Sequence, residues 1–262
     1  MPFAASDGVR IYWEEAGSGE PLLLIMGLGY SHQMWHRTTP AVSQSFRTIQ
    51  FDNRGVGGSD VPPGPYPIAS MAADAAAVLD AAGVQSAHVY GISMGGMIAQ
   101  EFAIQYPERV RKLILGCTAC GGPKVVRATD EVNRAVMARG NMTVEEGIQA
   151  MVPYIYDPGT PRARIDEDLA IRRRTFPKPE GYFAQLQGIL AWESYSRLSK
   201  ITAPALVIHG ENDLLVPAGN GELVVESIPG AKLVTIPNAS HLYMTDQPET
   251  SLRLVMDFLL GQ

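Results

Sequence analysis

Short apolar runs alternate with helix-like segments along the first half of the chain. Four runs have the length and composition of strands buried on both faces: PLLLIMG (21–27), RTIQFD (47–52), AHVYG (87–91) and VRKLILGC (110–117). Two segments between and after them have a helical period: ASMAADAAAVLDAAG (69–83) and MGGMIAQEFAIQYP (94–107). This alternation predicts a mostly parallel sheet with helices on both faces, an α/β fold.

Both ends of the chain extend this pattern. FAAS (3–6) and RIYWEEA (10–16) flank Asp7-Gly8, which predicts an antiparallel β-hairpin. In the last quarter, APALVIHG (203–210) and AKLVTIP (231–237) predict strands with a helix between them, and PETSLRLVMDFLLG (248–261) predicts a closing amphipathic helix.

Residues from about 120 to 196 have a different character. They contain amphipathic, helix-like pieces cut by Pro and Gly, among them VEEGIQAMVPYIYD and GYFAQLQGILAWESYSRL, with no β-branched strand run between them. The sequence therefore predicts a core domain made of residues 1–119 and 197–262, and a helical insertion of residues 120–196.

Composition narrows the classes of partner. The 262-residue chain is 46% hydrophobic and 18% charged, as expected for a globular protein with a core. Its formal net charge of −6 leaves no basic surface for nucleic acid. The sequence shows no signal-peptide pattern at its start and no apolar stretch of membrane-spanning length, so a cytoplasmic protein without a membrane partner is expected. Oligomeric state is left open.

Two cysteines lie close together in CTAC, at Cys117 and Cys120. No second cysteine pair and no nearby histidine completes a four-ligand set, so we interpret them as buried thiols and expect no metal site.

The stretch HVYGISMGGMIAQ (88–100) places one serine at a strand-to-helix junction. A strand that turns directly into a helix forces the middle residue into a strained conformation and requires small residues two positions before and after it. Gly91 and Gly95 meet that requirement around Ser93. The pattern predicts that Ser93 is a nucleophile exposed at a helix N-terminus.

A serine hydroxyl needs a base to attack at neutral pH. His241 lies in the loop after the last predicted strand, from which it can reach across the carboxyl edge of the sheet toward Ser93. His88 and His209 fall within predicted strands and are interpreted as structural. His241 is therefore the expected base.

The imidazole in turn needs a carboxylate that fixes its tautomer. Glu211 and Asp213 both follow the next-to-last predicted strand, and Asp213, just before the turn into LLVP, is favoured. The other place for an acid, after VRKLILG, offers only Cys-Thr-Ala-Cys.

The chain order Ser93, Asp213, His241 and the motifs DNRGVGGSD, GISMGG, GENDLLVP and SHLYMTDQPE resemble the α/β-hydrolase fold family over nearly the full length. In size and in the place of its insertion the chain is similar to the esterase, enol-lactonase and cofactor-free perhydrolase group. The resemblance implies a mostly parallel eight-stranded sheet, a helical cap formed by the insertion, and catalysis without cofactors.

The resemblance also implies an oxyanion hole of two backbone N–H groups. Met94, directly after the nucleophile, is expected to supply one. Leu28, which follows Gly27 in a matched loop, is expected to supply the other. Met26 stands where related hydrolases often carry histidine; because the donor is a backbone group, the hole is expected to persist.

Further residues are expected around this site. In the family-like loop 51–60, Asp52 and Arg54 are expected to form a buried pair that ties loops together without taking part in the chemistry. The cap is expected to cover Ser93. The expected pocket-lining residues are His32, Trp192, Tyr195 and Tyr154, with Met151 and Phe183 as further candidates.

The sequence thus predicts a serine hydrolase of small to medium carboxylic esters, with lactones included. Two alternatives use the same triad: hydrolysis of a C–C bond in β-diketone-like substrates, and cofactor-free perhydrolysis. A third is a ligand receptor that has kept the fold without the activity.

Overall fold

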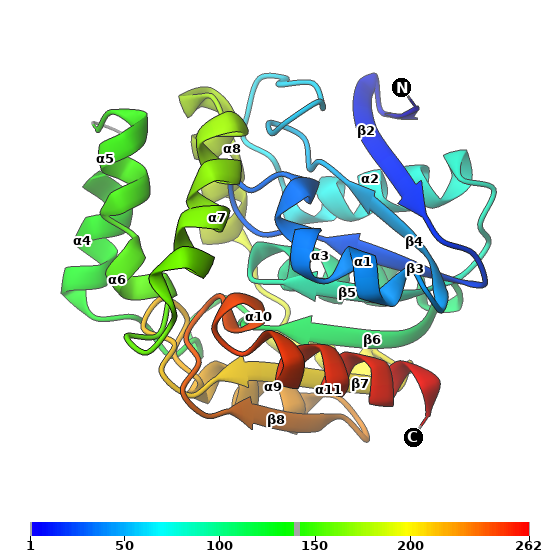
Figure 1. Ribbon diagram of the computed structural model, residues 1–262. Helices are drawn as coiled ribbons and strands as arrows, with labels where there is room; N and C mark the ends of the chain where they lie inside the picture. Colours follow the sequence, from blue (N-terminus) through cyan, green and yellow to red (C-terminus); the bar gives the residue numbers. More distant parts are fainter. Residues whose placement is uncertain (1, 139–141, 262) are drawn as a thin grey trace.

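The computed structural model describes residues 2–138 and 142–261. Within that part of the chain, eight strands form one sheet in the order β1-β2-β4-β3-β5-β6-β7-β8 (Figure 1). The strands are β1 Phe3–Ser6, β2 Val9–Ala16, β3 Glu20–Ile25, β4 Phe46–Phe51, β5 Ala87–Ile92, β6 Val110–Gly116, β7 Ala205–Gly210 and β8 Lys232–Ile236.

The first two strands are antiparallel and the rest of the sheet is parallel. β1 pairs with β2 as the predicted hairpin, and β2 pairs antiparallel with β4. The five remaining pairings, β3 with β4, β3 with β5, and β5 through β8 in sequence, are all parallel. The predicted α/β architecture is confirmed, and the carboxyl ends of β3 to β8 meet at one edge.

Helices connect these strands. The α-helices are α1 Thr39–Val42, α2 Ile68–Ala81, α3 Met94–Gln105, α4 Asp130–Ala138, α5 Val144–Gln149, α6 Val152–Ile155, α7 Arg162–Arg174, α8 Pro179–Ala191, α9 Gly219–Ser227, α10 Tyr243–Asp246 and α11 Pro248–Leu260. Short 3-10 helices lie at η1 His32–Arg37, η2 Pro107–Arg109 and η4 Tyr195–Lys200.

Each face of the sheet has its own apolar core. In β3, Leu23 and Ile25 belong to a core that α2, α3 and α9 cover, whereas Leu22 and Leu24 belong to a second core that α1 and α11 cover. Successive side chains of a strand point to opposite faces. A strand between two helical layers must therefore be apolar at every position, which is the reason for the unbroken run LLLI.

Helices α4 to α8 stand beside the carboxyl edge of the sheet, between β6 and β7 in the chain (Figure 1). The two ends of this segment lie together: Gly121 forms a β-bridge with Glu193, and the Ser194 N–H donates to the Cys120 carbonyl at 2.8 Å. A segment whose ends meet in this way leaves and re-enters the sheet at one place.

Helix α8 approaches the core through two glycines. A Cβ at Gly188 would lie 1.9 Å from the carbonyl oxygen of Tyr66, and one at Gly181 would lie 2.2 Å from that of Gly55. Both obstacles are backbone atoms, so α8 could accept a side chain at either position only by moving away. Glycine is a poor helix former, and close packing explains its presence here.

We predict that Gly188→Ala lowers the melting temperature. This would happen even though alanine is intrinsically more favourable than glycine in a helix by about 1 kcal/mol. The exposed neighbour Gln187 provides the matched control, because Gln187→Ala changes the same helix without meeting the core. Thermal unfolding followed by circular dichroism measures both. Equal or higher stability of the Gly188 variant would show that α8 is not held at this distance.

Candidate active site

Ser93 lies at the corner between β5 and α3 with φ 55° and ψ −124°. A non-glycine residue in such a conformation costs about 1–3 kcal/mol and persists only where its surroundings hold it. The Ser93 N–H donates to the Gly116 carbonyl, and the Ser93 carbonyl accepts from Thr118 Oγ1, each at 2.8 Å. Ser93 is partly exposed between buried neighbours.

The glycines around this corner are required by contact. A Cβ at Gly91 would lie 2.2 Å from the carbonyl oxygen of Gly95, and a Cβ at Gly95 would lie 2.1 Å from that of Ile25. A Cβ at Gly27, in the loop after β3, would lie 3.1 Å from the Ser93 Cβ. The loop after β3 therefore lies directly against the serine.

His241 and Asp213 approach the same edge from the loops after β8 and β7. His241 Nδ1 lies 2.8 Å from Asp213 Oδ2, and both side chains are buried. The second carboxylate oxygen, Oδ1, accepts the backbone N–H groups of Leu215 and Val216 at 2.9 and 2.8 Å. Because Nδ1 faces the carboxylate, Nε2 is the ring nitrogen left for other partners.

The environment of Asp213 favours its charged form. Burial by itself would raise the pKa of this carboxyl group, but the charge of His241 and hydrogen bonds from His209 and His241 hold the pKa below its ordinary value. His209 Nε2 lies 2.7 Å from the Val216 carbonyl and 3.5 Å from Asp213 Oδ2, a structural position within β7 and its following turn.

Ser93 and His241 line one cavity of about 380 Å³, which we call the Ser93 cavity. Leu28 and Met94, whose N–H groups are the expected oxyanion donors, line it as well. Met94 is the first residue of α3, so its N–H has no acceptor within the helix. The other lining residues are Met26, Gly27, Tyr30, Ile92, Met97, Asn133, Val136, Met137, Met151, Tyr182, Leu186, Ile189, Leu190, Leu215, Val216 and Leu242.

Three buried polar contacts hold the loop that carries Leu28. The Gly29 N–H donates to Gln185 Oε1 of α8 at 2.9 Å. Asn53 Nδ2 donates to the Met26 carbonyl at 2.9 Å, and the His32 N–H donates to Asp52 Oδ1 at 2.8 Å. Gln185 itself is fully buried, and its Nε2 donates to the Arg54 carbonyl.

Three aromatic residues expected in the pocket lie elsewhere, which corrects that prediction. Trp192 is packed in the core, where its Nε1 donates to Glu101 at 2.7 Å. Tyr195 packs against the same core, and the Tyr154 hydroxyl donates to Glu131 at 2.8 Å. None of the three is among the described residues that line the Ser93 cavity.

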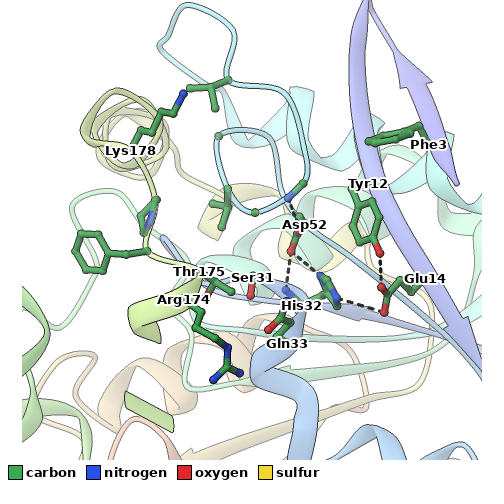
Figure 2. Close-up of a pocket in the computed structure, with 17 residues that line it drawn as sticks. Phe3, Tyr12, Glu14, Ser31, His32, Gln33, Asp52, Arg174, Thr175 and Lys178 are labelled. Carbon is green, nitrogen blue, oxygen red and sulfur yellow. Dashed lines mark hydrogen bonds and ion pairs between the residues drawn. The ribbon is translucent and has the colours of Figure 1, made fainter. Parts of the chain in front are cut away.

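His32 also lies outside the Ser93 cavity. It lines a separate cavity of about 490 Å³ between the loop 55–58 and the segment 174–178 (Figure 2). Figure 2 shows its ring between Asp52 and Glu14: Nδ1 lies 2.8 Å from Asp52 and Nε2 lies 3.4 Å from Glu14. Although burial lowers the pKa of His32, these two carboxylates raise it above its ordinary value.

The expected pair of Asp52 and Arg54 does not form. Asp52 accepts from His32 and from the Gly58 N–H, whereas Arg54 makes a two-pronged ion pair with buried Asp74 of α2 at 2.6 and 2.7 Å. Both residues tie loops to the core, but with different partners.

Residues 20–152 match the alpha/beta hydrolase fold family. The chain belongs to this family. A poly(3-hydroxyalkanoate) depolymerase of Ectopseudomonas oleovorans is 34% identical over 248 residues, which cover 91% of this chain and 84% of that protein. A protein of Azorhizobium caulinodans named for carbamate hydrolysis (RutD) is 30% identical over 261 residues, 98% of each chain.

Among solved structures, the enol-lactonase from Burkholderia xenovorans superposes with a TM-score of 0.89 at 26% identity, and the match covers 99% of this chain and all of that one. The match to this enol-lactonase therefore extends over helices α4 to α8 as well as over the sheet.

Sequence reasoning named Met151, which lines the Ser93 cavity, but it missed most of the other lining residues because it concentrated on aromatic side chains. The walls are largely aliphatic, and several of these residues are neighbours of the candidate triad: Leu215 and Val216 follow Asp213, Leu242 follows His241, and Met97 lies one turn beyond Ser93. Gln185 was missed too, although a glutamine within the apolar stretch AQLQGIL was a signal for a buried polar contact.

Within residues 2–138 and 142–261, no group of three or more His, Cys, Asp or Glu side chains is arranged to hold a metal ion. Cys117 and Cys120 are both buried and free, as predicted. The helices in this described part are all too short or too polar to cross a bilayer.

Asp246, on α10, supports the loop that carries His241. Its Oδ2 accepts the Ser240 N–H at 2.7 Å and its Oδ1 accepts the Thr160 hydroxyl at 2.5 Å. Burial raises the pKa of Asp246 to about 6, against the lowering effect of these hydrogen bonds. The pKa of an aspartate in the unfolded chain is about 4. Between about pH 4 and pH 6 the folded protein therefore binds more protons at this position than the unfolded chain does.

The contribution of Asp246 to stability is therefore present at low pH and is lost as the pH rises through about 6. We predict that Asp246→Asn, which keeps an acceptor for Ser240, gains stability relative to the unchanged protein as the pH rises from 4 to 7. Urea denaturation of both proteins across this range measures the difference. A difference that does not change with pH would contradict the prediction.

Proposed function

We propose that the protein hydrolyses carboxylic esters, lactones included, through an acyl-enzyme formed on Ser93. The observation that carries this proposal is the arrangement at one cavity of a partly exposed, strained Ser93 and of His241, whose Nδ1 lies 2.8 Å from buried Asp213. Kinship with depolymerase, carbamate-hydrolysing and lactonase proteins supports a hydrolytic reaction on a small-molecule substrate.

In the proposed reaction the Ser93 oxygen attacks the carbonyl carbon while His241 takes its proton through Nε2. The charged Asp213 stabilises the imidazolium that forms and keeps Nδ1 protonated. The protonated His241 then donates to the leaving alcohol. Water repeats the sequence on the acyl-enzyme and releases the acid and the serine.

The negative charge that develops on the carbonyl oxygen needs fixed donors. The proposed donors are the N–H groups of Met94 and Leu28, two residues that line the same cavity as Ser93. One such donor typically contributes about 3–4 kcal/mol to the transition state. Helices α4 to α8, which supply much of the lining, are proposed to act as the cap that keeps water out.

We predict that Ser93→Ala lowers kcat on an aryl ester by about 10⁶-fold and that Asp213→Asn lowers it by about 10⁴-fold. A fluorophosphonate probe should add covalently to the unchanged protein and not to the Ser93 variant, as measured by intact-protein mass spectrometry. Ser196→Ala, at an exposed position of η4, is the matched control.

Four further substrates are assayed beside the esters: a lactone, an aryl carbamate, a β-diketone, and peroxide with acetate. The last two are included because C–C hydrolysis and perhydrolysis use the same triad. If the diketone or peroxide is turned over faster than any ester, C–C hydrolysis or perhydrolysis replaces ester hydrolysis as the proposed function. A folded protein that neither reacts with the probe nor turns over any substrate would favour a receptor.

Gln185 gives a separate prediction for the oxyanion loop. Gln185→Ala removes the acceptor for the Gly29 N–H, next to the Leu28 donor, so we expect kcat to fall about 10-fold to 100-fold with little change in KM. Gln187→Ala, exposed on the same helix, should leave both constants unchanged. A rise in KM at constant kcat would place Gln185 in substrate binding instead.

A further inference from the structure

The two most exposed large apolar side chains of the described residues lie at the Ser93 cavity. Leu190 of α8 is 73% exposed and Met137 of α4 is 58% exposed, and both line that cavity. Single exposed apolar residues are ordinary on a protein surface. The presence of both extremes at the opening of one cavity requires a more specific explanation.

The lining changes gradually from buried to exposed along α8. Leu186 is buried, Ile189 is half-buried and Leu190 is exposed. Ile189 and Leu190 lie three and four positions after Leu186, so both are its neighbours on one face of the helix. Val136 and Met137 contribute in the same way from α4. An apolar path therefore runs from the serine to the surface, and we call its outer part, Val136, Met137, Ile189 and Leu190, the apolar lip.

The chemistry of the cavity restricts what can follow this path. Among its described lining residues there is no Asp, Glu, Lys or Arg. Its volume of about 380 Å³ is near the lower end of the range of about 300–1,000 Å³ for ligand cavities. A long substrate must therefore extend beyond the cavity, and the part that leaves it meets aliphatic side chains.

We propose that the apolar lip binds the distal part of a long, uncharged aliphatic chain of the substrate. This inference rests on the proposed ester hydrolysis and names its substrate class: esters with a linear chain that is too long for the cavity alone. Each methylene group that the lip covers increases the affinity for the substrate, by up to about fourfold when the group is completely buried.

The test compares chain lengths in two series. One series varies the acyl chain from C2 to C12 on a constant p-nitrophenol, and the other varies the alcohol from C2 to C12 on a constant acetate. All substrates are kept below their micelle-forming concentrations. In one of the two series, kcat/KM of the unchanged protein should rise with length to at least C8, and that series identifies which side of the ester follows the path.

Leu190→Ser and Met137→Ser should each lower the C10-to-C2 ratio of kcat/KM about three- to tenfold in that series. The matched control is Leu260→Ser on α11, an equally large side chain that is 49% exposed and lies outside the cavity lining. Leu260→Ser should keep the ratio of the unchanged protein. Leu190→Gln provides a second variant in case serine weakens α8.

Three outcomes would overturn the inference. The ratio could be the same in all variants, or the lip variants could lose activity equally at every length. They could also keep the ratio in solution and lose activity only on emulsified ester, which would assign the lip to a lipid-water interface. A protein that hydrolyses C2 ester in any of these cases keeps its proposed function, whereas failure on every ester together with no fluorophosphonate labelling would refute that function itself.

Discussion

The corner at Ser93 is the constraint on which the rest of the site depends. A parallel strand that passes directly into a helix brings three backbone segments within contact distance, so Gly91 and Gly95 cannot carry side chains there, and a Cβ at Gly27 would pack tightly against Ser93. The unfavourable conformation of Ser93 is fixed by hydrogen bonds to β6 and to the segment after it. The strain keeps the hydroxyl at the surface of a cavity while the surrounding backbone is buried.

The helices beside the sheet are joined to this corner by polar atoms as well as by apolar packing. Gln185 is fully buried on α8 and bonds both the Gly29 N–H and the Arg54 carbonyl, so it links the insertion to the two loops after β3 and β4. The close approach of Gly181 and Gly188 to the segment between β4 and α2 makes that link geometrically feasible. The placement of α8 and the shape of the loop that carries Leu28 are thus connected.

The sheet edge and the insertion make different contributions. Loops after β5, β7 and β8 supply Ser93, Asp213 and His241, whereas α4 and α8 supply an uncharged and largely aliphatic part of the cavity wall. In the proposed function, the chemistry and the choice of substrate therefore rest on different elements. The two are coupled at α8, because Gln185 joins that helix to the loop that carries Leu28.

The sequence by itself determined the order of strands and helices, the corner at Ser93, and the places of Asp213 and His241, because these follow from local patterns and from the rule that parallel strands end at one edge. It did not determine which side chains meet. Trp192, Tyr195 and Tyr154 do not line the Ser93 cavity, and Arg54 pairs with Asp74 of α2 instead of Asp52. Helical periodicity shows which face of a helix is apolar, but not which element that face packs against. The rotation and docking of each helix, set by contacts such as those of Gly188 and Gln185, decided the cavity wall only in the tertiary structure.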